Sequence, residues 1–313
     1  MMSKEGKREK TEEVILLFGK NGQLGGELLK TLTPLGKIIS PGRSEIDLLE
    51  QAKLREIISA VKPSLVINAA AYTAVDQAET EREQAMAING VAPGVMAEEC
   101  KKIGALLIHY STDYIFDGAK GSAYNEEDKP NPLNYYGLTK LTGEEAIRLS
   151  GGAHLILRLG WVYGSRGSNF LLTMLKLARE REELRIVNDQ VGTPNWSYML
   201  AESTAAICSQ IKGRLSAEGS AFKSGVYHLS ALGETTWYKF AKSIFEHSAD
   251  VDRLLRALIP IKSEEYKTAA IRPAYTVLNS GKLEQDYSII TEHWENYLIR
   301  VINSMGLGSG QTQ

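Results

Sequence analysis

The chain has 313 residues, a formal net charge of -2, and a composition of 43% hydrophobic and 24% charged residues. This length gives one large α/β domain or two smaller ones with a substantial core. The near-neutral charge argues against a nucleic-acid partner. The two cysteines, Cys100 and Cys208, are too few for a disulfide framework and indicate a reducing compartment. No segment is long and apolar enough to cross a bilayer, so we expect a soluble, cytoplasmic protein with no membrane partner.

The first predicted unit is a strand, a glycine turn and a helix. Val14–Phe18 is continuously apolar, as in a parallel strand covered on both faces. It is followed by Gly19, Gly22 and Gly25 at a G-x-x-G-x-x-G spacing and then by helical periodicity. Glycines in such a turn let backbone N–H groups approach a pyrophosphate at a helix N-terminus. We therefore predict a dinucleotide site here, although the spacing differs from G-x-G-x-x-G.

The end of the second predicted strand, 37–40, is where such folds distinguish the two nicotinamide cofactors. An acidic residue directly at this strand end would bind the ribose 2′-hydroxyl of NADH and repel the 2′-phosphate of NADPH. None stands there, and Arg43 is placed to pair with the phosphate. The sequence therefore favours NADPH. Glu45 leaves NADH open, and a solvated loop charge is the alternative interpretation of Arg43.

Strand and helix patterns continue to alternate to about residue 150. Helices are expected over 48–59 and 81–102, and strands over 64–73 and 105–110. This alternation is typical of βαβ units in a doubly wound parallel sheet of the Rossmann type. Thr112 follows the last of these strands, and ligands of open α/β sheets bind at the carboxyl ends of strands.

Tyr136 and Lys140 lie four residues apart, which places them on one face of a predicted helix. A nearby cation favours the phenolate and lowers the pKa of a tyrosine from about 10. Taken alone, the spacing is weak evidence, because an exposed helix commonly carries a Tyr and a Lys one turn apart. Its position after the glycine turn and Thr112 makes a catalytic pair the better hypothesis.

Beyond residue 164 the regular alternation ends. Helices are expected over 170–181, 198–211, 237–247 and 287–302, with a strand over 226–229. The predicted organisation is a disordered leader (1–13), a Rossmann-type cofactor domain (14–164), a smaller mixed α/β substrate domain (165–305) in which 226–230 returns to the main sheet, and a disordered tail (306–313).

The order and spacing of four motifs resemble the extended short-chain dehydrogenase/reductase family. These motifs are Gly19-x-x-Gly22-x-x-Gly25, Asn68-Ala-Ala-Ala71, Ser111-Thr112-Asp113 and Tyr136-x-x-x-Lys140. The chain is similar to the branch of this family that reduces dTDP-4-dehydro-β-L-rhamnose, over the stretches 17–25, 68–76, 111–118, 161–164, 188–194, 225–228 and 272–275. The resemblance implies NADPH-dependent reduction of the C4 ketone of this nucleotide sugar to dTDP-L-rhamnose.

The resemblance also implies residue roles. Tyr136 would protonate the carbonyl oxygen, Lys140 would lower its pKa and hold the nicotinamide ribose, and Thr112 would hydrogen-bond the same oxygen. The substrate side would comprise Thr112, Asp113 and Trp161, with a core position as the alternative for Trp161. The cofactor contacts, including those inferred above, would be Gly19, Gly22, Gln23, Leu24, Gly25, Arg43, Asp47, Leu48, Ala71, Tyr72, Thr73, Tyr110, Tyr136 and Lys140.

The sequence departs from this branch at several positions, including Tyr72, where His is common. Leu159 and Gly160 stand before Trp161 where the family has Thr and Ser, which removes two small polar groups from the sugar side. Some relatives bind Mg²⁺ at a dimer interface, and Glu27 matches one ligand, but Tyr198 stands where another acidic ligand is expected. We therefore predict no metal site, while a homodimer stays open.

Other members of the family are nucleotide-sugar epimerases or 4,6-dehydratases. Dehydratases have Asp-Glu after the threonine, whereas Asp113 and Tyr114 follow Thr112 here, which favours plain reduction. A rival of another class is the NADP-binding regulatory subunit of methionine adenosyltransferase, in which a retained site serves binding alone.

Overall fold

A computed structural model describes residues 13–215, 223–249 and 253–308, and its centre is a six-stranded parallel sheet. The strand order is β10-β5-β4-β3-β1-β2. The bounds are β1 Val14–Phe18, β2 Lys37–Ile39, β3 Leu65–Asn68, β4 Leu106–Thr112, β5 His154–Leu159 and β10 Gly225–His228. Strands are added outward on one side from β1 to β2, and on the other side from β3 onward. The carboxyl ends of β1 and β3 therefore flank the switch point, where doubly wound sheets bind ligands. The Rossmann-type prediction is confirmed.

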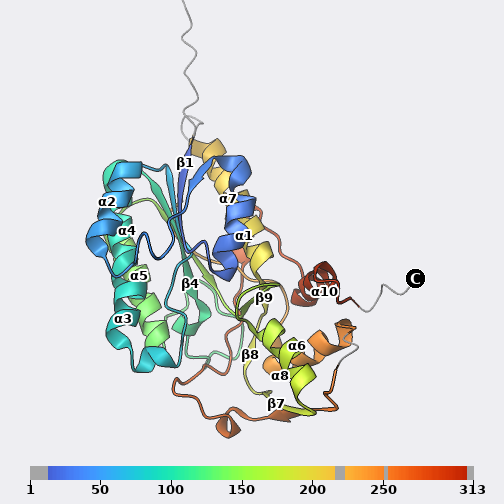
Figure 1. Cartoon of the computed structure of the whole chain (residues 1–313). Helices are drawn as coiled ribbons and strands as arrows, with labels where there is room; N and C mark the ends of the chain where they lie inside the picture. Colours follow the sequence, from blue (N-terminus) through green and yellow to red (C-terminus); the bar gives the residue numbers. More distant parts are fainter. Residues whose placement is uncertain (1–12, 216–222, 250–252, 309–313) are drawn as a thin grey trace, which may run out of the picture.

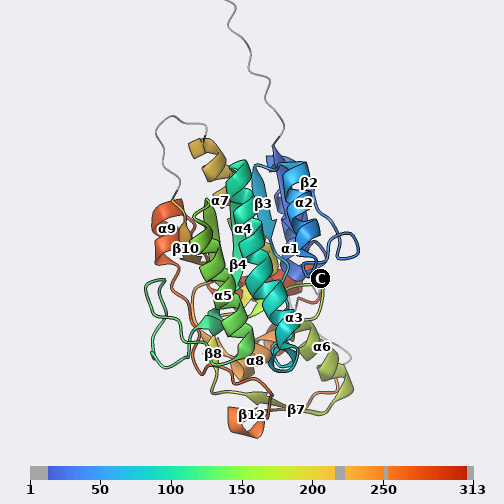
Figure 2. The same cartoon turned by 90° about the vertical axis from the view of Figure 1, so that its left-hand side faces the viewer.

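Helices cover both faces of this sheet (Figure 1). Figure 2 faces the layer formed by α2 (Gln51–Val61), α4 (Ala92–Ile103) and α5 (Tyr135–Ser150). The opposite face is covered by α1 (Gln23–Thr31) and α7 (Ser197–Leu215). Successive strand side chains alternate between two apolar clusters, one on each face. This double covering explains why the strands are continuously apolar rather than alternating.

The single helix expected over 81–102 is divided into three parts. It consists of α3 (Arg82–Met86), a π-helical turn η3 (Ala87–Val91) and α4. Pro93 lies in the first turn of α4, directly after the π turn. The wider π turn turns the Asn89 side chain inward, where it is buried. Such turns are common at functional sites.

A second lobe lies beyond the carboxyl ends of the main strands, in the lower half of Figure 1. It is built around α6 (Phe170–Glu180), α8 (Trp237–His247) and three two-stranded sheets. The expected helix 287–302 is wrong in its bounds, since α9 (Gly281–Tyr287) ends before α10 (Trp294–Ser304) begins. The paired short strands are β6 Val162–Tyr163 with β9 Asn195–Trp196, β7 Glu183–Val187 with β12 Ala257–Ile261, and β8 Val191–Gly192 with β11 Thr235–Thr236. The 3₁₀ turns are η1 Thr33–Leu35, η2 Gln77–Glu79, η4 Asp113–Ile115 and η5 Ser263–Glu265.

The second half of the chain also completes the first domain. α7 packs on α1, and β10 pairs with β5 in the main sheet. Both α7 and β10 follow residue 164 in the chain. The start of the expected tail is ordered, because the Ala249 N–H donates to the Leu307 carbonyl over 2.8 Å. The leader up to residue 12 and residues 309–313 lie outside the described residues. In the described part of the chain, no helix combines the length and apolarity needed to span a membrane.

Candidate active site

The glycine turn after β1 is shaped by close backbone contacts. Gly19 has φ +93°, and a Cβ there would lie 2.6 Å from the Ala69 carbonyl carbon at the end of β3. A Cβ on Gly25 would overlap the Gly19 carbonyl oxygen. No side chain caps α1, whose N-cap is Gly22, so its first backbone N–H groups remain available for a phosphate. The turn therefore fits a dinucleotide whose pyrophosphate approaches the backbone.

A cavity of about 150 Å³ continues from this turn toward the end of β2. The side chains of Lys20, Arg43 and Asp47 line it, and Leu48 supplies an apolar wall. The Arg43 Nε lies 3.3 Å from the Asp47 carboxylate. The Lys20 ammonium donates to the Ser40 carbonyl over 2.6 Å. The cavity thus brings the predicted Arg43, Asp47 and Leu48 together, and adds Lys20, which the sequence did not single out.

Glu45 has a structural partner at the same end of β2. Its carboxylate accepts the Gly42 N–H over 2.6 Å and lies 3.6 Å from the Lys20 ammonium. The Gly42 hydrogen bond and then the Lys20 charge hold the pKa of Glu45 below its usual value. Because this carboxylate is engaged within its own loop, the cations at the strand end are better placed for a ribose phosphate than Glu45 is for a ribose hydroxyl.

The end of β3 is fixed by Asn89, a residue that the sequence did not point to. The Asn89 side chain accepts the Tyr72 N–H over 2.8 Å and donates to the Tyr72 carbonyl over 2.9 Å. It also donates to the Thr139 hydroxyl of α5 over 3.1 Å. Ala71 and Thr73 on either side remain exposed. The backbone of this segment is therefore rigid beside the crevice.

Thr112 and Tyr136 meet at the carboxyl end of β4. Asn134 caps α5 by accepting the Gly137 N–H over 2.8 Å, which sets the start of the helix at Tyr135. Gly137 is required because a Cβ there would overlap the Tyr114 carbonyl oxygen. Burial raises the pKa of Tyr136 to about 12, and hydrogen bonding with Thr112 opposes that rise. The hydroxyl is thus held in its protonated form next to Thr112.

Lys140 lies one turn further inside and faces a different set of groups. Its Nζ donates to the Tyr110 carbonyl over 2.6 Å and lies 3.2 Å from the His109 Nε2. Burial lowers the pKa of Lys140 to about 8. Lys140 is not among the groups that shift the pKa of Tyr136, in contrast to the expectation from the motif. The four-residue spacing gave the shared helix face correctly but not the partner of the ammonium.

Tyr110 does not present its side chain to the crevice. Its hydroxyl is paired with the Thr204 hydroxyl over 2.7 Å on the opposite face of the sheet, and its ring is buried. The side chain is therefore not available to a nicotinamide, and its carbonyl serves Lys140. The sequence-based placement beside the cofactor is corrected in this respect, because successive residues of β4 point to opposite faces.

Asp113 is buried beside the two catalytic candidates. The Thr112 hydroxyl donates to its carboxylate over 3.1 Å, and burial raises the pKa of Asp113 to about 6 despite hydrogen bonding to Thr276 and Thr112. A Cβ on Gly160 would overlap this carboxylate. Gly160, which stands where the family has Ser, therefore leaves the space that the Asp113 carboxylate occupies.

Trp161 has a strained backbone, with φ +46°. Its ring stacks on that of Trp237 with centroids 3.5 Å apart and an interplanar angle of 5°. Both rings are partly exposed. A bulky residue in the left-handed region is uncommon outside functional sites. The pair, which we call the Trp161–Trp237 wall, joins the segment after β5 to α8, and the Trp161 ring is half-buried against its partner.

An ion pair between Asp76 and Arg272 joins the two lobes. The Asp76 carboxylate, in the loop after β3, accepts from the Arg272 guanidinium over 2.7 and 3.1 Å and from the Ala270 N–H over 3.0 Å. Asn134 also donates to the Ile271 carbonyl over 2.9 Å. The segment 270–272 is thereby held against the start of α5, next to Tyr136.

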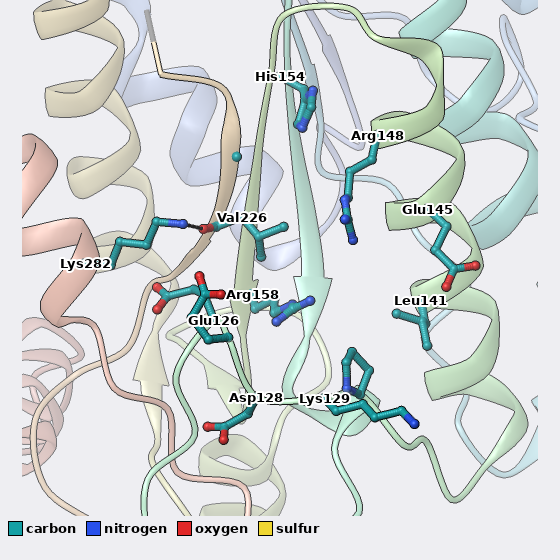
Figure 3. A pocket seen from close by; sticks show the side chains of 13 residues that line it. Glu126, Asp128, Lys129, Leu141, Glu145, Arg148, His154, Arg158, Val226 and Lys282 are labelled. Carbon is teal, nitrogen blue, oxygen red and sulfur yellow. Dashed lines mark hydrogen bonds between the residues drawn. The ribbon is translucent and has the colours of Figure 1, made fainter.

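A second cavity, wider than the one beside the glycine turn, lies elsewhere. It measures about 590 Å³ and runs between α5, the loop 126–130 and the starts of β5 and β10 (Figure 3). Acidic and basic side chains alternate around it, including Glu126, Arg148 and Lys282. Arg158 in its wall forms a buried ion pair with Glu144 over 2.7 Å. Its mixed charge and its position away from the strand ends that carry Thr112 make it a poor candidate for the reaction site.

Glu27, the residue that matches a metal ligand in some relatives, forms ion pairs with two basic side chains. The Glu27 carboxylate lies 3.0 Å from the Lys30 ammonium and 3.3 Å from the Arg166 Nε. The side chain of Gln23, one turn earlier, is bonded to Ser168 and Asn169 rather than to the crevice. In residues 13–215, 223–249 and 253–308, no group of three or more His, Cys, Asp or Glu side chains is arranged to hold a metal ion.

A glycine cradle at the switch point, followed by a Thr–Tyr–Lys group at the adjacent strand end, defines a nicotinamide-dependent oxidoreductase of the extended short-chain type. The family model described as RmlD substrate binding domain matches residues 13–307, and the chain belongs to this family.

Named relatives agree with this assignment. The chain is 43% identical over 285 residues to a dTDP-4-dehydrorhamnose reductase of Burkholderia thailandensis, covering 90% of this chain and 95% of the relative. It is 40% identical over 297 residues to the enzyme of that name from Escherichia coli, covering 93% and 97%. A crystal structure of dTDP-4-dehydrorhamnose reductase from Bacillus anthracis in complex with NADP superposes with a TM-score of 0.83 at 32% identity, covering 94% of this chain and 100% of that one.

Proposed function

We propose that this protein reduces the C4 ketone of dTDP-4-dehydro-β-L-rhamnose with NADPH, giving dTDP-L-rhamnose and NADP⁺. The observation that carries the proposal is the meeting of Thr112 and Tyr136 at the strand end beside the glycine cradle. The names of the relatives and the NADP-bound crystal structure support the same reaction and cofactor.

The turn of Gly19, Gly22 and Gly25 would hold the pyrophosphate with backbone N–H groups, since close backbone contacts fix its shape and no side chain caps α1. Arg43 and Lys20 would hold the 2′-phosphate at the end of β2, which favours NADPH over NADH. When bound, NADPH supplies the hydride that reaches C4. Ala71, Tyr72 and Thr73 would line the cofactor beside β3.

Negative charge develops on the C4 oxygen as the hydride arrives. Tyr136, protonated at neutral pH, would give its proton to this oxygen. The Thr112 hydroxyl would turn its proton from the Asp113 carboxylate to this oxygen and donate a hydrogen bond to it. Lys140 would hold the nicotinamide ribose from one turn further in the helix. Asp113 and the Trp161–Trp237 wall would contact the sugar, with the second lobe, mainly within 165–305, supplying the rest of the substrate site.

The test is direct incubation of the protein with dTDP-4-dehydro-L-rhamnose and either NADPH or NADH, followed by loss of absorbance of the reduced nicotinamide. We expect turnover with both reduced cofactors and a lower KM for NADPH. Absence of oxidation with this or any other nucleotide-linked ketosugar, together with tight NADP binding, would contradict the proposal and favour the regulatory-subunit alternative.

A further inference from the structure

A chain of buried polar groups lies behind the site and ends on Lys140. It runs from Asn68 at the end of β3, through His109 in β4, to Lys140 in α5. The three side chains are only 1 to 2% exposed. The Asn68 amide nitrogen lies 3.1 Å from the His109 Nδ1, and the His109 Nε2 lies 3.2 Å from the Lys140 Nζ. Neither Asn68 nor His109 has a part in the mechanism above.

The backbone sets the direction of the first hydrogen bond. The Ala70 N–H donates to the Asn68 Oδ1 over 3.2 Å. An N–H can only donate, so this contact identifies the oxygen of the amide and turns its NH₂ group toward His109. The His109 Nδ1 must then accept. The opposite amide orientation would bring two donors together at Ala70 and lose that hydrogen bond.

The second hydrogen bond follows from the first. His109 is enclosed, and burial, the largest cause, holds its pKa well below the usual range even without a charge on Lys140, so the ring is neutral. A neutral imidazole with an unprotonated Nδ1 carries its proton on Nε2. That N–H points at the Lys140 nitrogen. An ammonium has three donors and no lone pair, whereas an amine can accept this proton and still donate to the Tyr110 carbonyl.

We propose that Asn68 and His109 are positioning residues that direct a lone pair of Lys140 toward His109 and thereby favour the amine form of Lys140 in the free enzyme. The charge state of Lys140 is thus decided by the orientation of one amide, set by the backbone at the end of β3, beside the cofactor crevice. The consequence for turnover rests on the proposed function, while the hydrogen-bond assignment does not.

The other groups around Lys140 are consistent with this balance. Glu144, one turn further along α5, favours the ammonium, but burial outweighs it. Its carboxylate is engaged by the Arg158 side chain of β5 through contacts of 2.7, 2.9 and 3.2 Å. Among the described residues, His109 of β4 and Glu144 are the titratable groups whose interactions with Lys140 shift a pKa. Because the pKa of Lys140 is lowered to about 8, one hydrogen bond is enough to decide its charge near neutral pH.

The first experiment reads the His109 tautomer in the full chain by ¹⁵N NMR of labelled histidine, with the His109 signals assigned through the backbone. We expect a directly bonded proton on Nε2 and none on Nδ1 at pH 7. A proton on Nδ1, or on both nitrogens, would overturn the proposal. This measurement needs no substrate, so it remains decisive if the proposed reaction fails.

The second experiment uses Asn68→Ala, which removes the donor without adding charge. The His109 proton is then free to move to Nδ1, and Nε2 can accept from the Lys140 ammonium. We expect the tautomer to change and the alkaline limb of the turnover profile to move upward by about one pH unit, the size of one net hydrogen bond. Ile67→Val on the same strand, which alters packing alone, should leave tautomer and profile unchanged.

If Asn68→Ala changes the His109 tautomer but does not move the alkaline limb of the turnover profile, the link from Asn68 and His109 to Lys140 is refuted. If Asn68→Ala does not fold, the tautomer of the unmodified protein still decides the assignment, and His109→Gln takes the place of the variant in the pH profile. With the imidazole removed, the same upward movement of the limb is expected, and an unmoved limb counts against the proposal.

Discussion

The proposed cofactor turn and the proposed substrate side are built in opposite ways. The turn uses residues 19–25, whose backbone atoms contact one another and the end of β3. The substrate side uses side chains that are distant in the chain, such as Asp76 with Arg272 and Trp161 with Trp237. A binding surface made from one short segment is robust to changes elsewhere, whereas one made across two lobes depends on how the lobes meet.

The largest expected effect is a loss of turnover without a loss of cofactor binding. Tyr136→Phe removes the proposed proton donor, so turnover should fall by about 10² to 10⁴-fold, the range of general acid catalysis. The affinity for NADPH, measured by fluorescence titration, should remain close to that of the unmodified protein. Turnover near the original rate would contradict the assignment of Tyr136.

Gly25→Ala tests the cofactor turn. The new methyl group would overlap the Gly19 carbonyl oxygen, which is backbone and cannot move aside without opening the turn. We expect the Kd for NADPH to rise at least about tenfold and stability to fall by roughly 1–3 kcal/mol, as in other overpacked sites. Gly225→Ala is the matched control, since its nearest neighbour would be 3.7 Å away. Equal effects of the two variants would show that the close approach does not matter.

Asp113 provides a pH-dependent test on the substrate side. Its pKa is raised from 3.8 to about 6 in the folded protein, so between about pH 4 and pH 6 the folded state binds more protons than the unfolded state. Its contribution to stability therefore decreases as the pH rises through this window and stays low above it. At neutral pH the charged Asp113 thus lowers the free energy of unfolding by roughly 2–3 kcal/mol, and Asp113→Asn should restore it. In urea unfolding at pH 7 the variant should therefore be more stable than the unmodified protein, and this difference in stability should vanish near pH 4. An advantage that is the same at both pH values would exclude the carboxylate as its source.

The smallest effect is expected for the ion pair between the lobes. Its side chains are 21% and 43% exposed, so solvent screening limits the coupling to about 1 kcal/mol in a double-mutant cycle of Asp76→Ala and Arg272→Ala. Each single variant should raise the KM for the nucleotide sugar several-fold and leave the Kd for NADPH unchanged. A change in NADPH affinity as large as the change in KM would mean that the pair supports the cofactor side instead.

The sequence predicted the parts of the site that depend on local spacing. Continuous apolar runs indicated strands covered on both faces, and the glycine spacing, Thr112 at a strand end and the Tyr136–Lys140 helix face all lie where their patterns placed them. Each of these depends on contacts within a few residues or on the period of one element. The π turn at Asn89 had no such signal, because the surrounding sequence has ordinary helical periodicity.

Only the tertiary structure decided which groups surround those side chains. Lys140 turns to His109 and the Tyr110 carbonyl, Tyr110 turns away to Thr204, and Gly160 makes room for Asp113. These outcomes depend on which faces of neighbouring strands and helices meet. The hydrogen bonds of Lys140 and Tyr110 join residues that are 30 to 94 positions apart in the chain. The sequence by itself thus predicted a Rossmann-type reductase with Tyr136 as its proposed acid, and the packing of its elements determined the electrostatic surroundings of Tyr136 and Lys140.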